Sequence, residues 1–583
     1  MPRFRPRNLL LSLVFGGCVL GAQAQEEDYA VDIDGPSDAV NLLERHLDLY
    51  KWRSRGIEAD ELRAVIERTP ADAEALLNTA GYFKPKVEAR LEGEAGHYRV
   101  RVTVDPGKLA LVRNVALSLE GPINEDTEYR DRMLAFLERN PPLSKDVPFS
   151  QSAWSAYKRR ALTALQFQRY PAARITRSEA RIDPATASAD LTLVLDSGPF
   201  YRYGEVRIDG LSRYPERIVR DQVHLEPGAE FNRRDLQKLQ ADLQDMPNFS
   251  TVIVEPALSA DPPYEAPIHV TVQEAPLQKM TLGAGYSTNT GFRGEVTHRY
   301  NNVAGRGWIL DSDIRLEQLE QAIEVGLTFP KHASGYSHRI YASGERSTSN
   351  NLDSDTYKAG ISRAAKGDRI DRTITLEYLA ERRELDDGTV ENPQTLALSY
   401  QWIRRDLDSL RNPRKGSVLQ LEAGGGVRGV LSDETFLRLY GRTTYYWPVA
   451  DADVLIGRLE IGNTSTKDPS RVPTDFLFRA GGSNSVRGYD YESLGVRDGD
   501  TVKGGRVLAT ATLEYQHAVY KDWRAAVFVD HGDAANNWGD YSGKTGVGVG
   551  ARWVSPVGVL GADVAYGIDD EQIKLYFALG VAF

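Results

Sequence analysis

Ile573 to Phe583 reads IKLYFALGVAF, and its side chains alternate in character. The odd-numbered positions are all apolar, whereas the even-numbered positions, from Lys574 to Ala582, are polar or small. A stripe with a period of two over about ten residues has the length of a tilted strand that crosses a bilayer. The segment stops on an aromatic residue, so we expect it to be the last strand of the chain. An edge strand of a soluble sandwich is the alternative interpretation.

The amino-terminal residues have the pattern of a secretory signal. Arg3, Arg5 and Arg7 precede an apolar run from Leu9 to Leu20, and Ala22-Gln23-Ala24 follows as a small-x-small cleavage site. We therefore expect a signal peptide at 1–24. The chain has 583 residues and a mean hydropathy of −0.42, and after residue 24 it lacks an apolar run long enough for a spanning helix.

Composition narrows the class of protein. Cys18 is the only cysteine and lies inside the predicted signal, so the mature chain is expected to have neither disulfides nor thiolate metal sites. Lipidation of Cys18 is an alternative that Phe15 disfavours. The formal charge of −11 argues against a nucleic-acid-binding protein. Export, low hydropathy and alternating strands favour a barrel in a Gram-negative cell outer membrane, because only half of each strand faces lipid.

Residues 26–275 alternate helical and strand-like stretches in a repeated β-α-α-β-β order, with Pro-Gly or Gly-Pro pairs at the joins. The pattern predicts three α+β modules, at 26–106, 107–196 and 197–275, in front of a barrel at 276–583. In the first module we expect helical segments at Asp38–Tyr50, Asp60–Glu67 and Ala71–Gly81. An ordinary multi-domain enzyme is the alternative for this half of the chain.

The second half predicts a transmembrane β-barrel of about sixteen antiparallel strands. Val507, Ala509 and Ala511, for example, alternate with Thr510 and Thr512. An even number of strands closes a barrel and leaves no lipid-exposed edge, with the polar parity facing the lumen. About forty residues separate the strands near Val454–Thr464 and Val507–Gln516, and so long a connection usually carries function.

The long connection contains Val486-Arg487-Gly488-Tyr489. Two carboxylates downstream are candidate partners for Arg487. Asp530 has the parity of a lumen residue, and Glu514 points inward from the preceding strand. Bidentate pairing with a carboxylate would hold an otherwise mobile loop inside the pore. An arginine in a solvated extracellular loop is the alternative.

Several motifs together resemble the outer-membrane protein assembly superfamily, whose members combine periplasmic POTRA modules with a sixteen-stranded barrel. Val486 to Tyr489 resembles the signature loop motif of that family, and Phe528 to Gly532 resembles its F-x-D-x-G strand. Asn302 to Gly307 resembles its N-x-x-G-x-G turn, and Asp408 to Gly416 its D-x-x-x-x-P-x-x-G element. The resemblance implies that Arg487 pairs with Asp530, with Glu514 on the strand before it.

The resemblance also implies function. Three modules are similar to the translocation and assembly module branch, which helps insert or secrete outer-membrane proteins such as autotransporters. The implied partners are unfolded outer-membrane protein clients, the lipid bilayer and an inner-membrane-anchored periplasmic protein that docks on the first module. A transporter secreting one dedicated substrate and a passive porin-like channel remain alternatives. The sequence predicts no enzyme, cofactor or metal site: it lacks G-x-S-x-G and H-E-x-x-H, and Gly543-Lys544-Thr545 leads into a strand.

Glycines gather where the barrel must close. Gly283 and Gly285 lie in the first predicted strand and Gly580 in the last, which ends at Phe583. Glycine within a strand adds backbone entropy and removes side-chain packing, so these strands should pair weakly. We hypothesise that this seam is a lateral gate. The alternative is that glycines are simply common in barrel strands.

Overall fold

The computed structural model describes residues 29–53, 59–93, 98–139, 141, 143–449, 452–556 and 558–582. The predicted signal peptide and Phe583 lie outside the described residues. None of the described helices is both long and apolar enough to cross a membrane.

The first α+β module places its helices against a three-stranded sheet of order β1-β3-β2. Its elements are β1 (Tyr29–Asp34), α1 (Ser37–His46), α2 (Asp48–Lys51), α3 (Ala59–Thr79), β2 (Lys86–Glu92) and β3 (Tyr98–Asp105). The predicted division of α3 into two helices is wrong, because the helix continues through Pro70. Leu62, Ala73 and Leu77, on both sides of that proline, are buried in one core, and this packing outweighs the lost backbone hydrogen bond. The predicted helix Asp38–Tyr50 is instead divided at Leu47.

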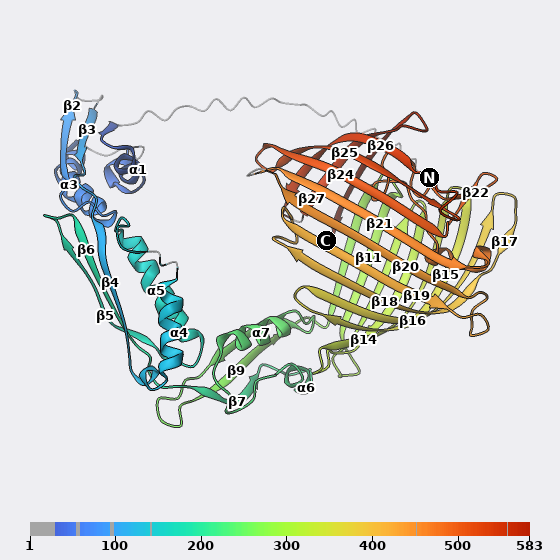
Figure 1. Cartoon of the computed structure of the whole chain (residues 1–583), viewed down its shortest axis with the longest axis horizontal. Helices are drawn as coiled ribbons and strands as arrows, with labels where there is room; N and C mark the ends of the chain where they lie inside the picture. The colour runs from blue at the N-terminus through green and yellow to red at the C-terminus, as the bar shows by residue number, and fades with distance from the viewer. Residues whose placement is uncertain are drawn as a thin grey trace, which may run out of the picture. The chain divides into compact units, whose positions relative to one another are not determined.

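The next two modules repeat the arrangement, with sheets of order β4-β6-β5 and β7-β9-β8. Figure 1 shows α4 and α5 beside the sheet of the second module. The second module contains β4 (Leu111–Glu120), η1 (Pro122–Glu125), α4 (Thr127–Glu138), α5 (Gln151–Phe167), β5 (Arg174–Asp183) and β6 (Ser188–Asp196). The third contains β7 (Arg202–Asp209), α6 (Arg217–Arg220), α7 (Arg233–Gln244), β8 (Phe249–Pro256) and β9 (Glu265–Glu274). The leucine stripe of α7 (Leu236, Leu239 and Leu243) is buried, as its spacing of three and four residues requires.

From residue 278 onward the chain forms a closed antiparallel barrel. Its first strands are β10 (Gln278–Ser287), β11 (Gly291–Val303), β12 (Trp308–Glu317), β13 (Glu320–Thr328), β14 (Tyr336–Ser349), β15 (Leu352–Lys366), β16 (Ile370–Leu385) and β18 (Gln394–Leu407). The remaining strands are β19 (Gly416–Gly426), β20 (Phe436–Pro448), β21 (Val454–Thr466), β24 (Val507–Tyr520), β25 (Trp523–Ala535), β26 (Lys544–Ser555), β27 (Gly558–Gly567) and β28 (Gln572–Ala582). A two-residue strand, β17 (Val390–Glu391), extends one hairpin. The predicted fold class, a barrel of about sixteen strands behind three α+β modules, is confirmed.

The turn after β11 joins the barrel to the third module. The Asn248 side chain donates to the carbonyls of Asn301 and Gly307, at 3.2 and 3.3 Å. The Asn302 side chain donates to the Arg213 carbonyl at 3.0 Å and accepts from the Gly307 amide at 2.8 Å. Gly307 has φ +71°, and a Cβ there would lie 2.1 Å from a methyl carbon of Ile218. The Asn302–Gly307 motif is therefore built for close contact with the module.

Candidate functional site

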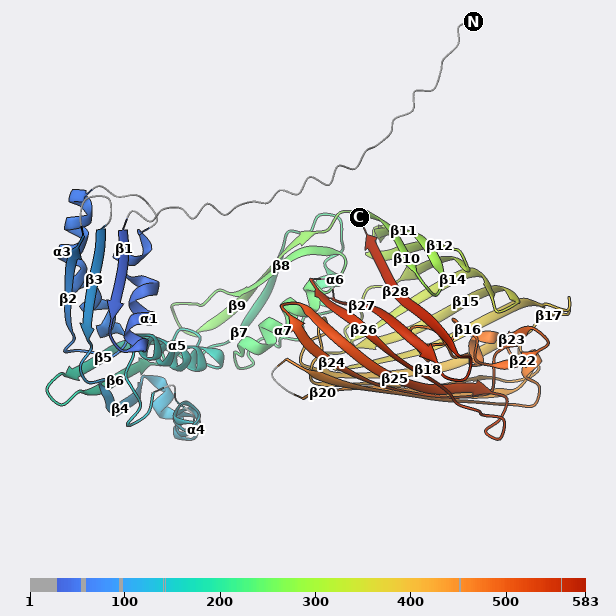
Figure 2. The same ribbon diagram turned by 90° about the horizontal axis from the view of Figure 1, so that it is seen from above.

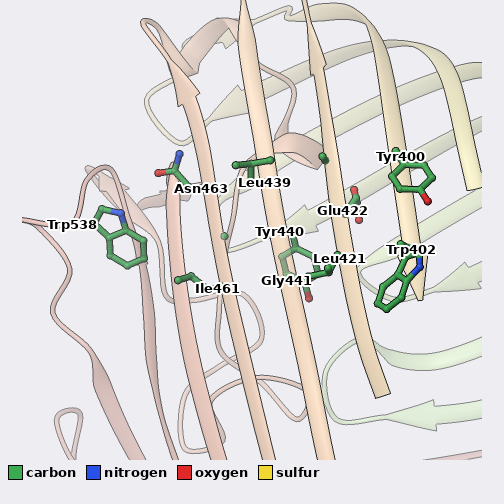
Figure 3. Close-up of a pocket in the computed structure, with 12 residues that line it drawn as sticks. Tyr400, Trp402, Leu421, Glu422, Leu439, Tyr440, Gly441, Ile461, Asn463 and Trp538 are labelled. Carbon is green, nitrogen blue, oxygen red and sulfur yellow. The ribbon is translucent and has the colours of Figure 1, made fainter. Parts of the chain in front are cut away.

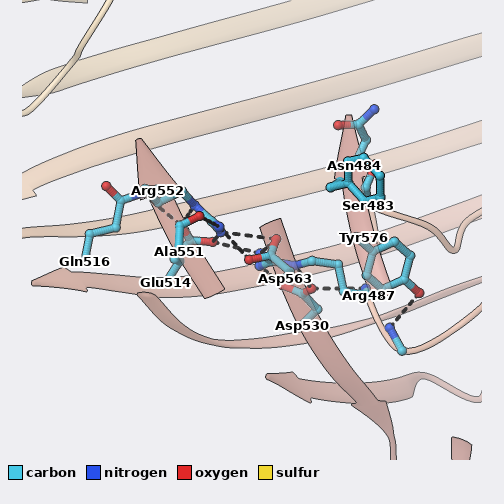
Figure 4. A network of polar contacts seen from close by, with 12 residues as sticks. Ser483, Asn484, Arg487, Glu514, Gln516, Asp530, Ala551, Arg552, Asp563 and Tyr576 are labelled. Atoms are coloured by element: carbon cyan, nitrogen blue, oxygen red, sulfur yellow. Dashed lines mark hydrogen bonds and ion pairs between the residues drawn. The ribbon is translucent and has the colours of Figure 1, made fainter. Parts of the chain in front are cut away.

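The long connection between β21 and β24 folds back into the barrel and meets the walls of the lumen. It contains η2 (Pro469–Arg471), η3 (Thr474–Phe476) and a small hairpin of β22 (Val496–Asp498) and β23 (Thr501–Lys503). Figure 4 shows Arg487, from this connection, among carboxylates that come from the barrel strands. We call residues 467–506 the lumen loop.

Arg487 and Asp530 form a bidentate pair. Arg487 Nε donates to Asp530 Oδ2 at 2.7 Å and Nη2 donates to Oδ1 at 3.0 Å. The backbone amide of Arg487 adds a third bond to Oδ2, at 3.1 Å. The Asp530 side chain is 0% exposed and that of Arg487 is 6% exposed, so little water competes for these bonds. The guanidinium also lies over the ring of Phe528, 3.3 Å from its centroid.

Three further charged groups extend the pair into a network (Figure 4). Arg487 Nη1 donates to Glu514 Oε2 at 2.8 Å and to Asp563 Oδ2 at 3.1 Å. Arg552 donates to both oxygens of Glu514, at 3.0 and 2.8 Å. It also bridges to Asp563 at 2.5 Å. Two guanidinium groups thus face three carboxylates contributed by β24, β25 and β27, and we call these five residues the arginine cluster. Because the carboxylates outnumber the cations, losing either arginine would leave buried negative charge unbalanced.

The residues after Arg487 sit in a notch made by glycines. Gly488 has φ +104°, a conformation that favours glycine, and a Cβ there would lie 2.8 Å from the Gly567 amide nitrogen. A Cβ at Gly546 would lie 1.7 Å from the Arg487 carbonyl oxygen. Backbone therefore packs directly on backbone, and side chains at these positions would displace the lumen loop. Val486, 0% exposed, anchors the adjoining apolar cluster.

A second anchor holds the first arm of the lumen loop to β16. The Arg383 side chain is 3% exposed and donates to the carbonyls of Val472 and Ser470, at 3.2 and 2.7 Å. Its Nε pairs with Glu391 at 2.6 Å. The Glu381 carboxylate accepts from the Thr474 amide and hydroxyl, at 2.8 and 2.7 Å. The loop is thus held on β16 as well as on the strands around Asp530.

Within the described residues, which end at Ala582, β10 and β28 share fewer residue pairs than any other two neighbouring long strands of the barrel. Five residue pairs join them, from Gly283↔Ala582 to Ser287↔Ala578, with Gly285 opposite Gly580. By contrast, β10 shares ten pairs with β11. The pairing of β28 is divided: Gln572–Phe577 pairs with β27 and Ala578–Ala582 pairs with β10. Phe577 marks the division, and its carbonyl also accepts from the amide of Thr288, just after β10, at 3.1 Å. Figure 2 shows β28 on the side of the barrel next to β10 and β11.

The lumen loop contacts both sides of this seam. On the β28 side, the Tyr576 hydroxyl accepts from the Gly488 amide at 2.9 Å and donates to the Tyr489 carbonyl at 2.6 Å. On the β10 side, the side chain of Asn289, in the hairpin after β10, donates to the Ser483 hydroxyl at 2.9 Å. The loop therefore spans the seam from inside the barrel.

Sequence reasoning and structure agree on some residues of this region and differ on others. The structure brings Val486, Arg487, Gly488 and Tyr489 together with Glu514 and Asp530, and it places Gly283, Gly285 and Gly580 at the seam. Phe583 lies outside the described residues. Arg552, Asp563 and Tyr576 were not predicted. Their lumen parity is readable from the sequence, but their convergence around Arg487 and Gly488 depends on the register of the five successive strands β24 to β28.

Comparison with known proteins identifies the family of the chain. The Omp85 superfamily domain matches residues 278–583, and the POTRA family, described as a surface antigen variable number repeat, matches residues 201–275. The outer membrane protein assembly factor BamA of Nitratidesulfovibrio vulgaris is 27% identical over 432 residues, covering 68% of this chain and 53% of the relative. BamA of Neorickettsia risticii is 23% identical over 412 residues, covering 65% and 54%. The chain thus spans about half the length of these curated relatives.

Among solved structures, BamA from Haemophilus ducreyi lacking POTRA domains 1-3 has a similar fold. The TM-score is 0.64 at 17% identity, and the match covers 78% of this chain and 97% of that one. At this identity the likeness speaks to the fold alone.

Proposed function

The chain belongs to the Omp85 superfamily, and from this premise we propose that it is an outer-membrane assembly factor of the TamA type, the translocation and assembly module subunit. The barrel lies in the outer membrane and its POTRA modules lie in the periplasm. The proposed activity is to help insert or secrete other outer-membrane proteins, such as autotransporters. The similar BamA proteins are named as assembly factors, which supports the assembly class. Three modules favour the TamA type over insertases with five.

The divided pairing of β28 is the observation that carries the proposal. A strand held by β27 along one half and by β10 along the other can separate from β10 by losing, among the described residues, five residue pairs and the bonds between Thr288 and Phe577. Opening would expose unpaired amides within the bilayer, where each costs several kcal/mol. A client strand could satisfy these amides by adding to the open edge. The seam would then template insertion without nucleotide hydrolysis.

A reversible lock across the seam tests this function. Gly285 and Gly580 are register partners, so Gly285→Cys with Gly580→Cys should form a disulfide under oxidation. We expect the oxidised protein to lose assembly of an autotransporter client, scored as protease-accessible client at the cell surface, and reductant to restore it. Ser362→Cys with Thr375→Cys, between β15 and β16, is the matched control and should leave assembly unchanged.

The same lock separates the alternatives. A transporter that exports one substrate through its lumen, or a passive channel, would not need the seam to open. Client assembly that is equal in the locked and reduced protein would therefore exclude the gate.

We further propose a TamB-like inner-membrane-anchored periplasmic protein as the partner of the first module. Its sheet order leaves β1 and β2 as edge strands, and an edge strand can accept a strand from another chain. Deleting residues 26–106 should abolish co-purification with such a partner while the barrel still inserts, as judged by heat-modifiable gel mobility. Undiminished co-purification would assign the contact to another part of the chain.

A further inference from the structure

An apolar groove of about 720 Å³ lies on the wall formed by β18 to β21, well away from the seam. Figure 3 shows Tyr400 and Trp402 at one side of it and Trp538 at the other, with Leu439 and Ile461 on the strands between. Leu439 and Ile461 are 49% and 59% exposed in the isolated chain. Their neighbours Arg438 and Glu460 have the opposite parity and join the polar contacts of the lumen. The groove therefore opens toward lipid.

Strand register explains why the wall is hollow here. One row across the sheet runs Trp402, Leu421, Gly441 and Ile461, and the next runs Tyr400, Ala423, Leu439 and Asn463. Small residues, Ala423 and Gly441, thus lie diagonally between large ones. A Cβ at 441 would meet Leu421 at 3.4 Å and Ile461 at 3.9 Å, which is ordinary contact. The missing side chains, and no backbone distortion, create the hollow.

The groove runs from the middle of the wall toward its extracellular end, where Asn463 and Trp538 lie. β10 starts where the third module ends, so the hairpin after β10 and every second hairpin after it are extracellular. The hairpin between β25 and β26, which carries Trp538, belongs to this set. Gly441 lies closer to the extracellular end of β20, at Phe436, than to Pro448. An aromatic residue at the extracellular end of the groove, such as Trp538, is typical of the membrane interface.

We propose that this groove holds one acyl chain of a membrane lipid, which exchanges more slowly than the lipid around the rest of the barrel. In a bilayer the hydrophobic effect does not distinguish protein from lipid tails, so retention depends on packing. A chain lying on Ala423 and Gly441 contacts large side chains on both flanks, whereas a chain on a convex wall contacts one side. Many weak dispersion contacts together favour the enclosed chain. Asn463 and Trp538 lie at the end of the groove where a headgroup begins.

Filling the groove tests the inference. Gly441→Leu places a leucine in the hollow, where the neighbouring side chains leave room. Gly344→Leu is the matched control: it is a lipid-facing strand glycine on β14, and a Cβ there would meet Tyr357 at 3.5 Å. The full chain and both variants are reconstituted in phosphatidylethanolamine vesicles, with and without lipopolysaccharide, and extracted into mild detergent. Native mass spectrometry then counts retained lipid per protein.

We expect one retained lipid on the parent chain and on Gly344→Leu, and at least a threefold lower occupancy on Gly441→Leu. The two vesicle compositions identify the headgroup that accompanies the chain. Equal retention in all three proteins would overturn the inference. So would a dimer mass that disappears in Gly441→Leu, because the occupant would then be a second copy. Heat-modifiable mobility verifies folding, and Ala423→Leu serves if Gly441→Leu does not fold.

Discussion

The two walls of the barrel that meet the lumen loop are built differently. Among the described residues, β15 and β16 share fifteen residue pairs, whereas β10 and β28 share five. At about 3.3 Å per residue, this is a ladder of roughly 50 Å against one of roughly 17 Å. On the β16 side, Arg383 holds the loop to a wall that is stable by itself. On the seam side, the loop bridges strands whose own pairing is short. The seam therefore relies on side chains for cohesion that the wall of β15 and β16 obtains from its backbone pairing.

Substitutions in the arginine cluster should have the largest effect on the stability of the barrel. In Arg487→Ala, Asp530 stays buried, and within the arginine cluster Arg552 alone is left opposite three carboxylates. Stranding a buried charge costs about 3–5 kcal/mol. We expect Arg487→Ala to lower the urea midpoint of the barrel and to abolish client assembly. Arg497→Ala, an exposed arginine of the same loop, is the control.

Asp530→Ala should be milder than Arg487→Ala. Arg487 keeps Glu514 and Asp563 as partners when Asp530 is removed, whereas Asp530 has donors only from Arg487 among the described residues. The double variant should add little to Arg487→Ala in the same urea titration. Equal single effects that sum in the double variant would contradict a shared network.

Removing the Arg383 anchor on β16 should have a smaller effect on the barrel than the substitutions in the arginine cluster. Arg383→Ala leaves the Val472 and Ser470 carbonyls without their donor, at about 1–3 kcal/mol for each stranded buried group. Because β15 and β16 remain fully paired, we expect the lumen loop to become accessible to protease while the barrel keeps its gel mobility. Arg382→Ala, an adjacent exposed arginine, should change neither. If Arg383→Ala instead opened the seam, the two walls would not be independent.

Aromatic packing at the seam should contribute least among the barrel contacts. The rings of Tyr286 and Phe577 lie 5.3 Å apart across the seam, and such pairs are worth about 0.5–1.5 kcal/mol. We expect Phe577→Ala to lower the temperature at which the folded gel band is lost and to slow oxidative locking of the cysteine pair at 285 and 580. Leu575→Ala, exposed on the same strand, is the control.

The structural features that depend on the pattern of neighbouring residues could be predicted from the sequence. Alternation with a period of two shows which side chains share a face, so strands and the inward direction of Glu514 and Asp530 follow from the residues. Contacts that depend on register between distant strands do not. Asp563 reaches Arg487, and Arg552 reaches Glu514, only once the four strands β24 to β27 are aligned. The divided pairing of β28 is a property of barrel closure. Pro70 shows the same limit in the modules, because core packing on both sides keeps α3 continuous against the local signal.

The contact between Glu274 and Arg213 lies in the third module, outside both walls of the barrel. The pH dependence of its stability can therefore be measured separately from that of the barrel. Burial alone would raise the pKa of Glu274, but hydrogen bonds from the Arg213 side chain and amide and from Ser212 lower that pKa to about 2. The unfolded chain, with an ordinary carboxyl pKa near 4.5, binds the proton first as pH falls. The stabilisation from Glu274 is therefore complete above about pH 5 and is lost progressively toward pH 2.

Glu274→Gln should consequently destabilise the module at neutral pH and lose this disadvantage near pH 2. The α-helices of the described residues all precede residue 278, so the thermal midpoint of the helical circular dichroism signal reports the modules and not the barrel. A gap between Glu274→Gln and the parent chain that stayed constant from pH 7 to pH 2 would show that the carboxylate charge does not stabilise this contact.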